Sequence, residues 1–160
     1  MLLTSVNKVM KNSLNKAIII AAKIHKGKKG RNREPAIMHP IRVMSLMKNN
    51  RSRTVAVLHD VVESGKITIQ ELEDIGFDPK VCKAVDLLSR KKSQKYFNYI
   101  DNIKTNKLAT TVKLADLTDN YLRRKQNRTS SKVDKQKIKK YKKAYKSLTG
   151  YSLKSTIDHI

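Results

Sequence analysis

Cysteine, tryptophan and acidic residues are scarce in this sequence. The single cysteine, Cys82, excludes an intramolecular disulfide and suits a reducing cytoplasm. The longest apolar run, residues 17–22, is far too short to span a bilayer, and the first residues, MLLTS, lack the basic start of a signal peptide. We therefore expect a cytoplasmic protein without a membrane segment.

The scarcity of acidic residues leaves the chain strongly basic. Its 160 residues include 36 Lys and Arg against 13 Asp and Glu, which gives a net charge of +23 at pH 7. This charge favours an anionic partner such as nucleotide phosphates, nucleic acid or an acidic protein, and it does not choose among them. The length and the apolar content of 39% suit one domain with a sizeable core, which we expect to cover residues 1–160.

Apolar residues recur at steps of three and four along most of the chain, and no alternating run is long enough to form a sheet. The first stripe consists of Val6, Val9, Met10, Leu14, Ala17, Ile18, Ala21 and Ile24. Later stripes begin and end at glycines, prolines and capping residues, and they predict helices that include residues 51–64, 79–88 and 106–125. The sequence therefore predicts an all-α bundle of six to eight helices.

The C-terminal part of the chain carries much of the charge. Residues 123–146 contain twelve basic residues and one acidic residue, so they hold eleven of the net +23 charges. Ile138, Tyr141, Tyr145 and Leu148 nevertheless keep a helical spacing. We expect residues 123–148 to form a basic C-terminal helix that packs on the bundle through these side chains, with its lysines directed outward.

Two charged residues interrupt the apolar run that follows Thr54. His59 and Asp60 lie between Val57-Leu58 and Val61-Val62. An unpaired buried carboxylate is costly, so such an Asp normally takes up a proton, pairs with a neighbour or binds a metal. Both a histidine paired with its neighbouring Asp and a metal site explain the pair. Glu63, at i+4 from His59, would share its helix face.

Two further polar residues lie elsewhere in the chain. His39 lies at the entrance of a short helix that starts near Pro40, where a capping or core histidine is common. Asp116 interrupts the apolar stripe of the helix 106–125, with Asn120 at i+4. This second carboxylate at an apolar position strengthens the interpretation of the His59-Asp60 pair as a metal site.

Three segments together carry a family resemblance: HP at 39–40, LHDVVE at 58–63 and VKLAD at 112–116, followed by Asn120. This order resembles the HD superfamily of metal-dependent phosphohydrolases, and in particular the hydrolase domains of RelA/SpoT-type proteins and the small alarmone hydrolases. The resemblance runs from about residue 17 to residue 124. It implies an all-helical HD domain that binds one divalent ion, usually Mn²⁺, and converts (p)ppGpp into GDP or GTP and pyrophosphate.

The resemblance also implies roles for individual residues. It makes Glu63 an acid that handles the attacking water and its proton, and it places Asn120 near the metal and the ribose. Arg31, in the basic segment KGKKGRNREP at 26–35, matches a phosphate-binding position, and Lys28 and Lys29 are further candidates because they lie just upstream of His39. The metal ligands that it implies are His39, His59, Asp60 and Asp116.

The sequence departs from the family pattern at three places. Ser64 follows Glu63 where a second acid is usual, Leu122 stands where an arginine is usual, and Ala36 stands where an aromatic is usual. Two alternatives therefore stay open: an HD phosphohydrolase of another nucleotide, and a catalytically weakened HD scaffold that binds nucleic acid through its basic face.

Three further questions concern the substrate and the assembly. Tyr96 and Tyr99 fit either a wall for a purine base or the core of the bundle. A nucleotide pyrophosphokinase domain is not expected, because little chain follows the hydrolase-like region. The sequence does not indicate an oligomeric state.

Overall fold

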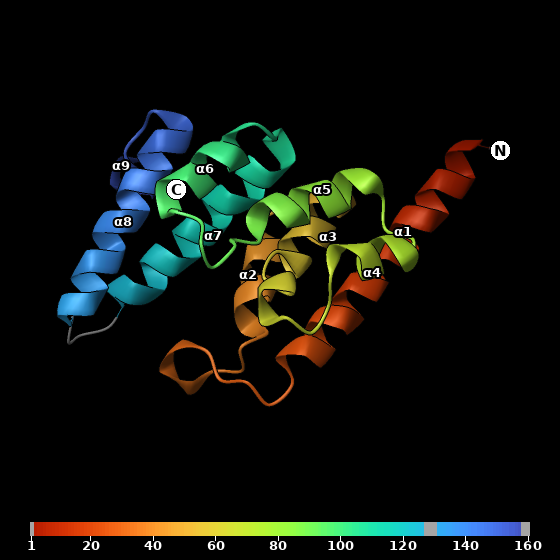
Figure 1. Ribbon diagram of the computed structural model, residues 1–160, viewed down its shortest axis with the longest axis horizontal. Helices are drawn as coiled ribbons and strands as arrows, with labels where there is room; N and C mark the ends of the chain where they lie inside the picture. Colours follow the sequence, from red (N-terminus) through yellow and green to blue (C-terminus); the bar gives the residue numbers. More distant parts are fainter. Residues whose placement is uncertain (1, 127–130, 158–160) are drawn as a thin grey trace.

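The computed structural model describes residues 2–126 and 131–157, with the backbone alone for residues 2–12 and 157. Within these ranges the chain forms α-helices joined by turns, without a β-strand, as the sequence predicts (Figure 1). The helices are α1 Leu2–His25, α2 Met38–Ser45, α3 Asn50–Leu58, α4 Ile69–Asp74, α5 Pro79–Leu88, α6 Tyr96–Lys104, α7 Lys107–Lys125, α8 Lys132–Thr149 and α9 Leu153–Ile157. These nine described helices exceed the expected six to eight because the short α9 carries no long apolar stripe. No described helix has the length and apolar character that a membrane span requires.

Helix α3 occupies the centre of the bundle and packs against α1, α2, α5 and α7. Its side chains from Val55 to Leu58 are fully buried, since a helix that is apolar on all sides is stable only inside the core. Asn49 caps its first turn by accepting a hydrogen bond from the Ser52 amide at 2.9 Å. The segment that carries His59 therefore starts from the most buried helix of the molecule.

Helix α1 lies along α3 through small side chains. Ala17 and Ala21, both fully buried, belong to the predicted stripe. Val6, Val9 and Met10, which begin that stripe, lie outside the residues whose side chains the structure describes. Small residues allow the two backbones to approach closely, and this contact carries the last turn of α1 toward the end of α3.

The helix predicted for residues 51–64 is shorter than expected. It ends at Leu58, and the chain continues through a turn into a single 3-10 turn, Val62–Ser64. The backbone bonds tighten here to i→i+3 spacing, as in Val61 N to Leu58 O at 3.1 Å, and Gly65 closes the segment with φ of +70°. The i+4 relation between His59 and Glu63 is therefore not that of one continuous α-helix.

The basic C-terminal region consists of two helices. Residues 123–125 still belong to α7, residues 127–130 lie outside the described ranges, and α8 starts at Lys132. Helix α8 packs on α6 and α7 (Figure 1). Its contact side buries Ala144 and Tyr145, and Ile138, Tyr141 and Leu148 pack half-buried beside them. The stripe expected from the sequence is the side that faces the bundle.

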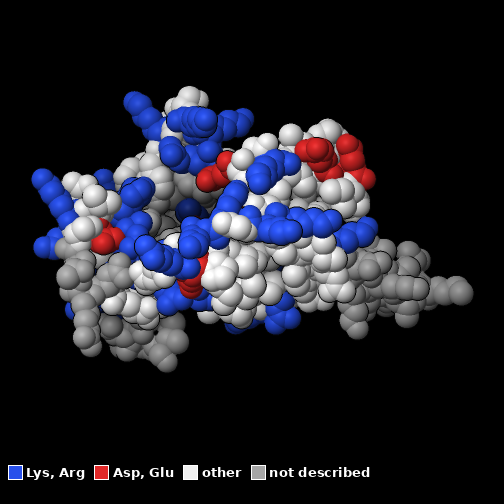
Figure 2. Space-filling model, turned by 90° about the horizontal axis from the view of Figure 1, so that it is seen from below, with Lys and Arg blue, Asp and Glu red and all other residues white. Residues whose placement is uncertain are grey.

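Positive charge covers much of the surface. On the face drawn in Figure 2, Lys and Arg side chains extend from one end of the described surface to the other, whereas Asp and Glu gather in a few small groups.

The basic segment 26–35 forms a loop held by its own backbone hydrogen bonds. It is closed by hydrogen bonds from Gly30 N to Glu34 O at 2.8 Å and from Ala36 N to Lys28 O at 3.0 Å. Asn32 and Arg33 adopt positive φ values of 57° and 61°, a conformation that costs energy for residues other than glycine.

Candidate metal centre

Three of the predicted ligands converge from three different helical segments. His39 lies in the first turn of α2, His59 directly follows α3, and Asp116 lies in the middle of α7. One ligand atom from each of these residues lies within 4.8 Å of the other two. His39 Nε2 is 3.1 Å and His59 Nε2 is 3.8 Å from Asp116 Oδ1, and the two imidazole rings are 5.2 Å apart. This is the spacing of groups that can share one ion.

Asp60, the fourth predicted ligand, is not part of this three-residue group. His25 Nε2 lies 3.3 Å from each carboxylate oxygen and donates a hydrogen bond to Oδ2, and the buried Oδ1 accepts no hydrogen bond among the described residues. Burial raises the pKa of Asp60, but the charge of His59, the bond from His25 and the charge of His39 together lower it. An orphaned buried carboxylate oxygen close to the cluster suits a cation, so the donor set fits a divalent ion.

The hydrogen bonds of the imidazoles decide which nitrogen is free. His59 Nδ1 donates to the Ala56 carbonyl at 2.6 Å, and His39 Nδ1 donates to Asp119 Oδ2 at 2.7 Å. Because carbonyl and carboxylate oxygens only accept, each Nδ1 carries a proton. Nε2 is therefore left for Asp116 or for an ion, the arrangement in which a second partner fixes the tautomer of a metal-binding histidine.

Charge holds His39 and Asp116 together when no ion is present. Burial lowers the pKa of His39, but hydrogen bonds to Asp116 and Asp119 outweigh it and raise that pKa to about 10. Burial raises the pKa of Asp116, whereas the Lys113 ammonium and the bond from His39 hold it well below its usual range. In the metal-free protein the His39 imidazolium therefore lies between two carboxylates and supplies the positive charge that they need.

Asp116 is fixed from two further directions. Lys113 Nζ is 2.8 Å from Asp116 Oδ2, and its ammonium lies over the ring of Tyr99 at 5.1 Å from the ring centroid. Asn120 donates to Asp116 Oδ1 at 2.5 Å and to the Asp116 carbonyl at 3.0 Å. The structure thus places Asn120 in contact with a predicted ligand, one helical turn away on α7.

A cavity of about 240 Å³ opens beside the cluster. Its walls include His39, Asp60 and Asn120 together with Arg31 and Arg42. A neighbouring cavity of about 330 Å³ is lined by Lys28 and Lys29, and His25 lines both cavities. The basic residues predicted to bind phosphate therefore border two adjoining cavities.

Two of the predicted site residues have other partners. The Arg31 guanidinium binds Asp134 of α8 at 3.1 Å, and Arg124 binds the same carboxylate. Glu63 is exposed, and its Oε1 accepts a hydrogen bond from the Arg90 amide at 2.8 Å. Glu63 does not line the 240 Å³ cavity, because the 3-10 turn after α3 directs it elsewhere.

Comparisons with known proteins bear on the fold of the chain. No family model matches the chain. The GTP pyrophosphokinases rsh of Brucella melitensis biotype 1 and Brucella abortus strain 2308 are each 30% identical over 83 residues. That match covers 49% of this chain and only 11% of each relative.

A solved structure is similar over nearly the whole chain. It is described as a metazoan ortholog of SpoT that hydrolyzes ppGpp and plays a role in starvation responses, and it superposes with a TM-score of 0.75 at 23% identity over 92% of each chain. The chain has the HD-domain fold.

Two residues beside the cluster, Asp119 and His25, are not predicted from the sequence. Asp119 binds His39 and also accepts from Arg42 Nε at 2.6 Å, while Arg42 forms a two-pronged contact with Glu34 at 2.9 and 3.0 Å. His25 donates from Nδ1 to the Ala21 carbonyl at 2.8 Å and directs Nε2 to Asp60. The available signals were the i+3 spacing of Asp119 from Asp116 and the position of His25 on the buried side of α1.

The two tyrosines considered for a purine wall differ in their surroundings. Tyr99 is buried and donates from its hydroxyl to the Leu88 carbonyl at 2.7 Å, so it belongs to the core. The ring of Tyr96 lies 4.3 Å from Lys140 Nζ, and burial raises the pKa of its hydroxyl to about 12. Neither tyrosine lines the 240 Å³ cavity beside the cluster.

Proposed function

We propose that this protein binds one divalent ion and hydrolyses the 3′-pyrophosphate of a guanosine alarmone, (p)ppGpp, giving GDP or GTP and pyrophosphate. The observation that carries this proposal is the convergence of His39, His59 and Asp116 within 4.8 Å in an HD-domain fold. A solved structure of the same fold is described as that of a ppGpp hydrolase. The buried free thiol of Cys82 suits a reducing compartment, and we propose a cytoplasmic location.

The proposed ligands are His39, His59, Asp60 and Asp116. Nitrogen and oxygen donors without a thiolate suit a six-coordinate ion, and Mn²⁺ is our first choice. When bound, such an ion supplies a water nucleophile at neutral pH and polarises a phosphoryl oxygen. Asp119 and the Ala56 carbonyl hold the two imidazoles with Nε2 facing the cluster, so the ligand geometry is set before the ion arrives.

Cations on the cavity walls would bind the pyrophosphate. Arg31 and Arg42 line the cavity beside the cluster, and Lys28 and Lys29 line the adjoining one. Charge spreads over the phosphoryl oxygens in the transition state, and cations fixed in advance stabilise it. Arg31 would exchange its contact with Asp134 for a phosphate, which an arginine can bind through two nitrogens.

Asn120 and Glu63 have separate proposed roles. Asn120 holds the carboxylate of Asp116 and faces the cavity where the ribose would lie. Glu63 would carry the proton of the attacking water, for which its carboxylate must leave the Arg90 amide and approach the cluster. We propose this motion because the segment around Glu63 is a short turn and not a rigid helix.

Product analysis tests the proposal directly. The Mn²⁺-loaded protein is incubated with ppGpp, and GDP and pyrophosphate are measured. We expect equimolar products, no activity after chelation, and loss of activity in His59→Ala. Asp101→Asn, an exposed acid on α6, is the control and should retain activity.

Two outcomes would change the assignment. Glu63→Gln should lower kcat about 100-fold or more while metal content stays at one ion per chain; full activity of this variant would exclude Glu63 as the proton carrier. Release of phosphate from other nucleotides, with ppGpp intact, would identify an HD phosphohydrolase of a different substrate.

A further inference from the structure

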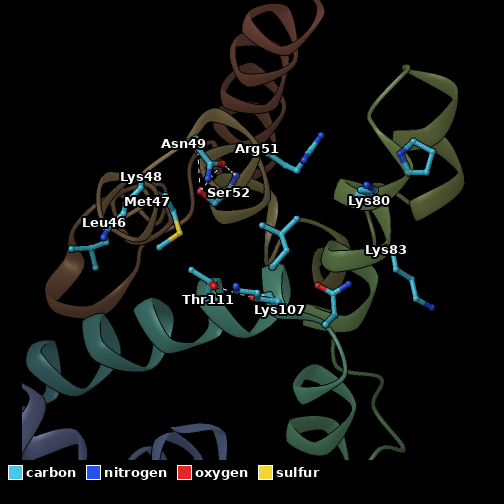
Figure 3. A pocket seen from close by; sticks show the side chains of 13 residues that line it. Leu46, Met47, Lys48, Asn49, Arg51, Ser52, Lys80, Lys83, Lys107 and Thr111 are labelled. Atoms are coloured by element: carbon cyan, nitrogen blue, oxygen red, sulfur yellow. Dashed lines mark hydrogen bonds between the residues drawn. The ribbon is translucent and has the colours of Figure 1, made fainter. Parts of the chain in front are cut away.

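A cavity much larger than those at the metal cluster lies elsewhere in the bundle. It has a volume of about 1060 Å³, against about 240 Å³ beside the cluster. Its walls come from the end of α2 and the beginnings of α3, α5 and α7 (Figure 3). Ligand pockets in proteins typically have volumes of about 300 to 1,000 Å³, so this cavity can hold a molecule of nucleotide size.

This cavity is separated from the metal cluster along the same helices. Ser52, in the first turn of α3, lines the cavity, and His59 follows the other end of that nine-residue helix. A helix of this length spans about 13 Å. Met47, just beyond α2, also lines the cavity, whereas His39 lies at the start of α2. The two sites therefore lie at opposite ends of α2 and α3.

The walls of this cavity carry positive charge. Its basic residues are Lys48, Arg51, Lys80, Lys83 and Lys107, and none of its described lining residues is acidic. Asp78 lies outside the lining and pairs with Arg51 at 3.2 Å, which leaves four lysines. Lys80 and Lys83 are three residues apart on α5, so they stand on one face of that helix (Figure 3). An anionic ligand would find several cations within one cavity.

Helix N-termini add to this positive charge. The capping residues Asn49 and Asn106 also line the cavity, so the positive ends of the α3 and α7 dipoles add to the charge of the side chains.

Apolar side chains complete the walls. Met47, Leu108 and Pro79 line the cavity, and Leu46 lies at it with 56% of its surface exposed. Lysines alone would suit any polyanion, but an aliphatic wall beside them suits a ligand with an apolar part and a phosphorylated part. We propose that this cavity is a second site that binds a nucleoside phosphate, separate from the metal cluster.

Methionine resonances can report on this site without any enzymatic turnover. Protein labelled with ¹³C at the methionine methyl groups is titrated with GDP in the absence of metal. Met47 is a buried lining residue of this cavity, and Met38 precedes the cluster residue His39. We expect a saturable shift of the Met47 resonance at GDP concentrations that leave the Met38 resonance unchanged.

Matched charge reversals separate a specific site from general attraction. Lys80→Glu with Lys83→Glu should raise the Kd for GDP at least tenfold, whereas Lys16→Glu with Lys66→Glu, two exposed lysines outside the cavity, should change it less than twofold. An equal loss in both pairs would indicate attraction by the overall charge and overturn the proposal. Pyrophosphate binding as tightly as GDP would overturn the nucleoside part, and an unshifted Met47 resonance at saturating GDP would overturn the site.

Because this titration measures binding without metal, its result is independent of whether ppGpp is hydrolysed. If the protein hydrolyses ppGpp but GDP does not shift the Met47 resonance, only the proposal of the second site is contradicted. A protein that binds GDP at Met47 and leaves ppGpp intact would contradict only the proposed activity.

Discussion

Asp119 lies beside the metal cluster and supports His39. Its carboxylate holds the Nδ1 proton of His39 at 2.7 Å and also binds Arg42. A carboxylate in this position fixes the tautomer and strengthens the basicity of the free nitrogen. The three-residue cluster therefore depends on a fourth side chain that no ion would contact.

We expect Asp119→Asn to weaken Mn²⁺ binding by about 10- to 100-fold, because an amide holds the imidazole less firmly than a carboxylate does. Titration calorimetry measures the affinity, and Asp101→Asn serves as the control because that acid is exposed on α6. An unchanged Kd in the Asp119 variant would show that the orientation of His39 does not depend on this contact.

The protonation of His39 couples metal binding to pH. The pKa of His39 rises from the ordinary value of 6.5 to about 10 in the metal-free fold. The group thus adds stability that is fully present below pH 6.5 and is lost as the pH rises toward 10. An ion needs the neutral imidazole, so its apparent affinity increases over the same range.

We therefore expect the gain in Tm on adding Mn²⁺ to grow steadily between about pH 6.5 and 8.5. Thermal unfolding with and without the ion at several pH values provides the measurement. In His39→Asn the gain should be small at every pH. A gain in the native protein that does not vary with pH would mean that His39 does not lose a proton on binding.

At the residue scale, the three side chains of the cluster could be predicted from the sequence. The residues that form hydrogen bonds with the predicted ligands, Asp119 and His25, could not. His59 interrupts an apolar run and Asp116 an apolar helix stripe, and both conflicts are visible in the sequence, whereas His39 is marked only by its place before Pro40. The contacts of His39 with Asp119 and of His25 with Asp60 join residues 80 and 35 positions apart. Such pairs depend on how helices pack, which local spacing does not determine.

At the scale of elements, the segment after α3 decides where the functional residues point. Periodicity correctly predicted helices α1, α5 and α7, and the side chains of Asp78 and Asn106 cap the first turns of α5 and α7. It extended α3 too far, because the apolar residues Val61 and Val62 continue the helical pattern through a turn held by i→i+3 bonds. Composition does not distinguish the last turn of an α-helix from a 3-10 turn.

Gly65 tests this segment. Its φ of +70° lies in the left-handed region, where a residue with a side chain costs about 1 to 2 kcal/mol. Alanine also makes the unfolded chain less flexible, which offsets part of this cost. We therefore expect Gly65→Ala to lower the free energy of unfolding by about 1 kcal/mol. Gly30→Ala is the control, since Gly30 has φ of −86° and a Cβ there meets only ordinary contacts from 3.5 Å. Urea unfolding measures both. Equal effects of the two substitutions would exclude backbone strain as the cause.

At the scale of the whole molecule, the candidate metal cluster and the positive surface charge lie in different places. The metal cluster is buried among three helices, whereas the lysines of α8 lie on the surface. Lys135, Lys139, Lys142 and Lys146 are exposed and repeat at steps of four, three and four, so they form one outward stripe. A net charge of +23 attracts any polyanion, and affinity of this origin does not require a dedicated surface.

We expect binding to a single-stranded RNA oligomer to weaken at least about tenfold between 50 and 200 mM salt, with the same slope with or without Mn²⁺, because neutralising phosphates releases counterions. Fluorescence anisotropy of the labelled oligomer measures the affinity. Reversing the four lysines of the α8 stripe to Glu should lower it no more than reversing four exposed lysines elsewhere, at positions 16, 23, 66 and 92. A loss confined to the α8 variant, together with tight binding at physiological salt and intact ppGpp, would instead favour a nucleic-acid-binding scaffold. In that case the basic surface would bind nucleic acid as the function of the protein, and the cluster of His39, His59 and Asp116 would only stabilise the fold.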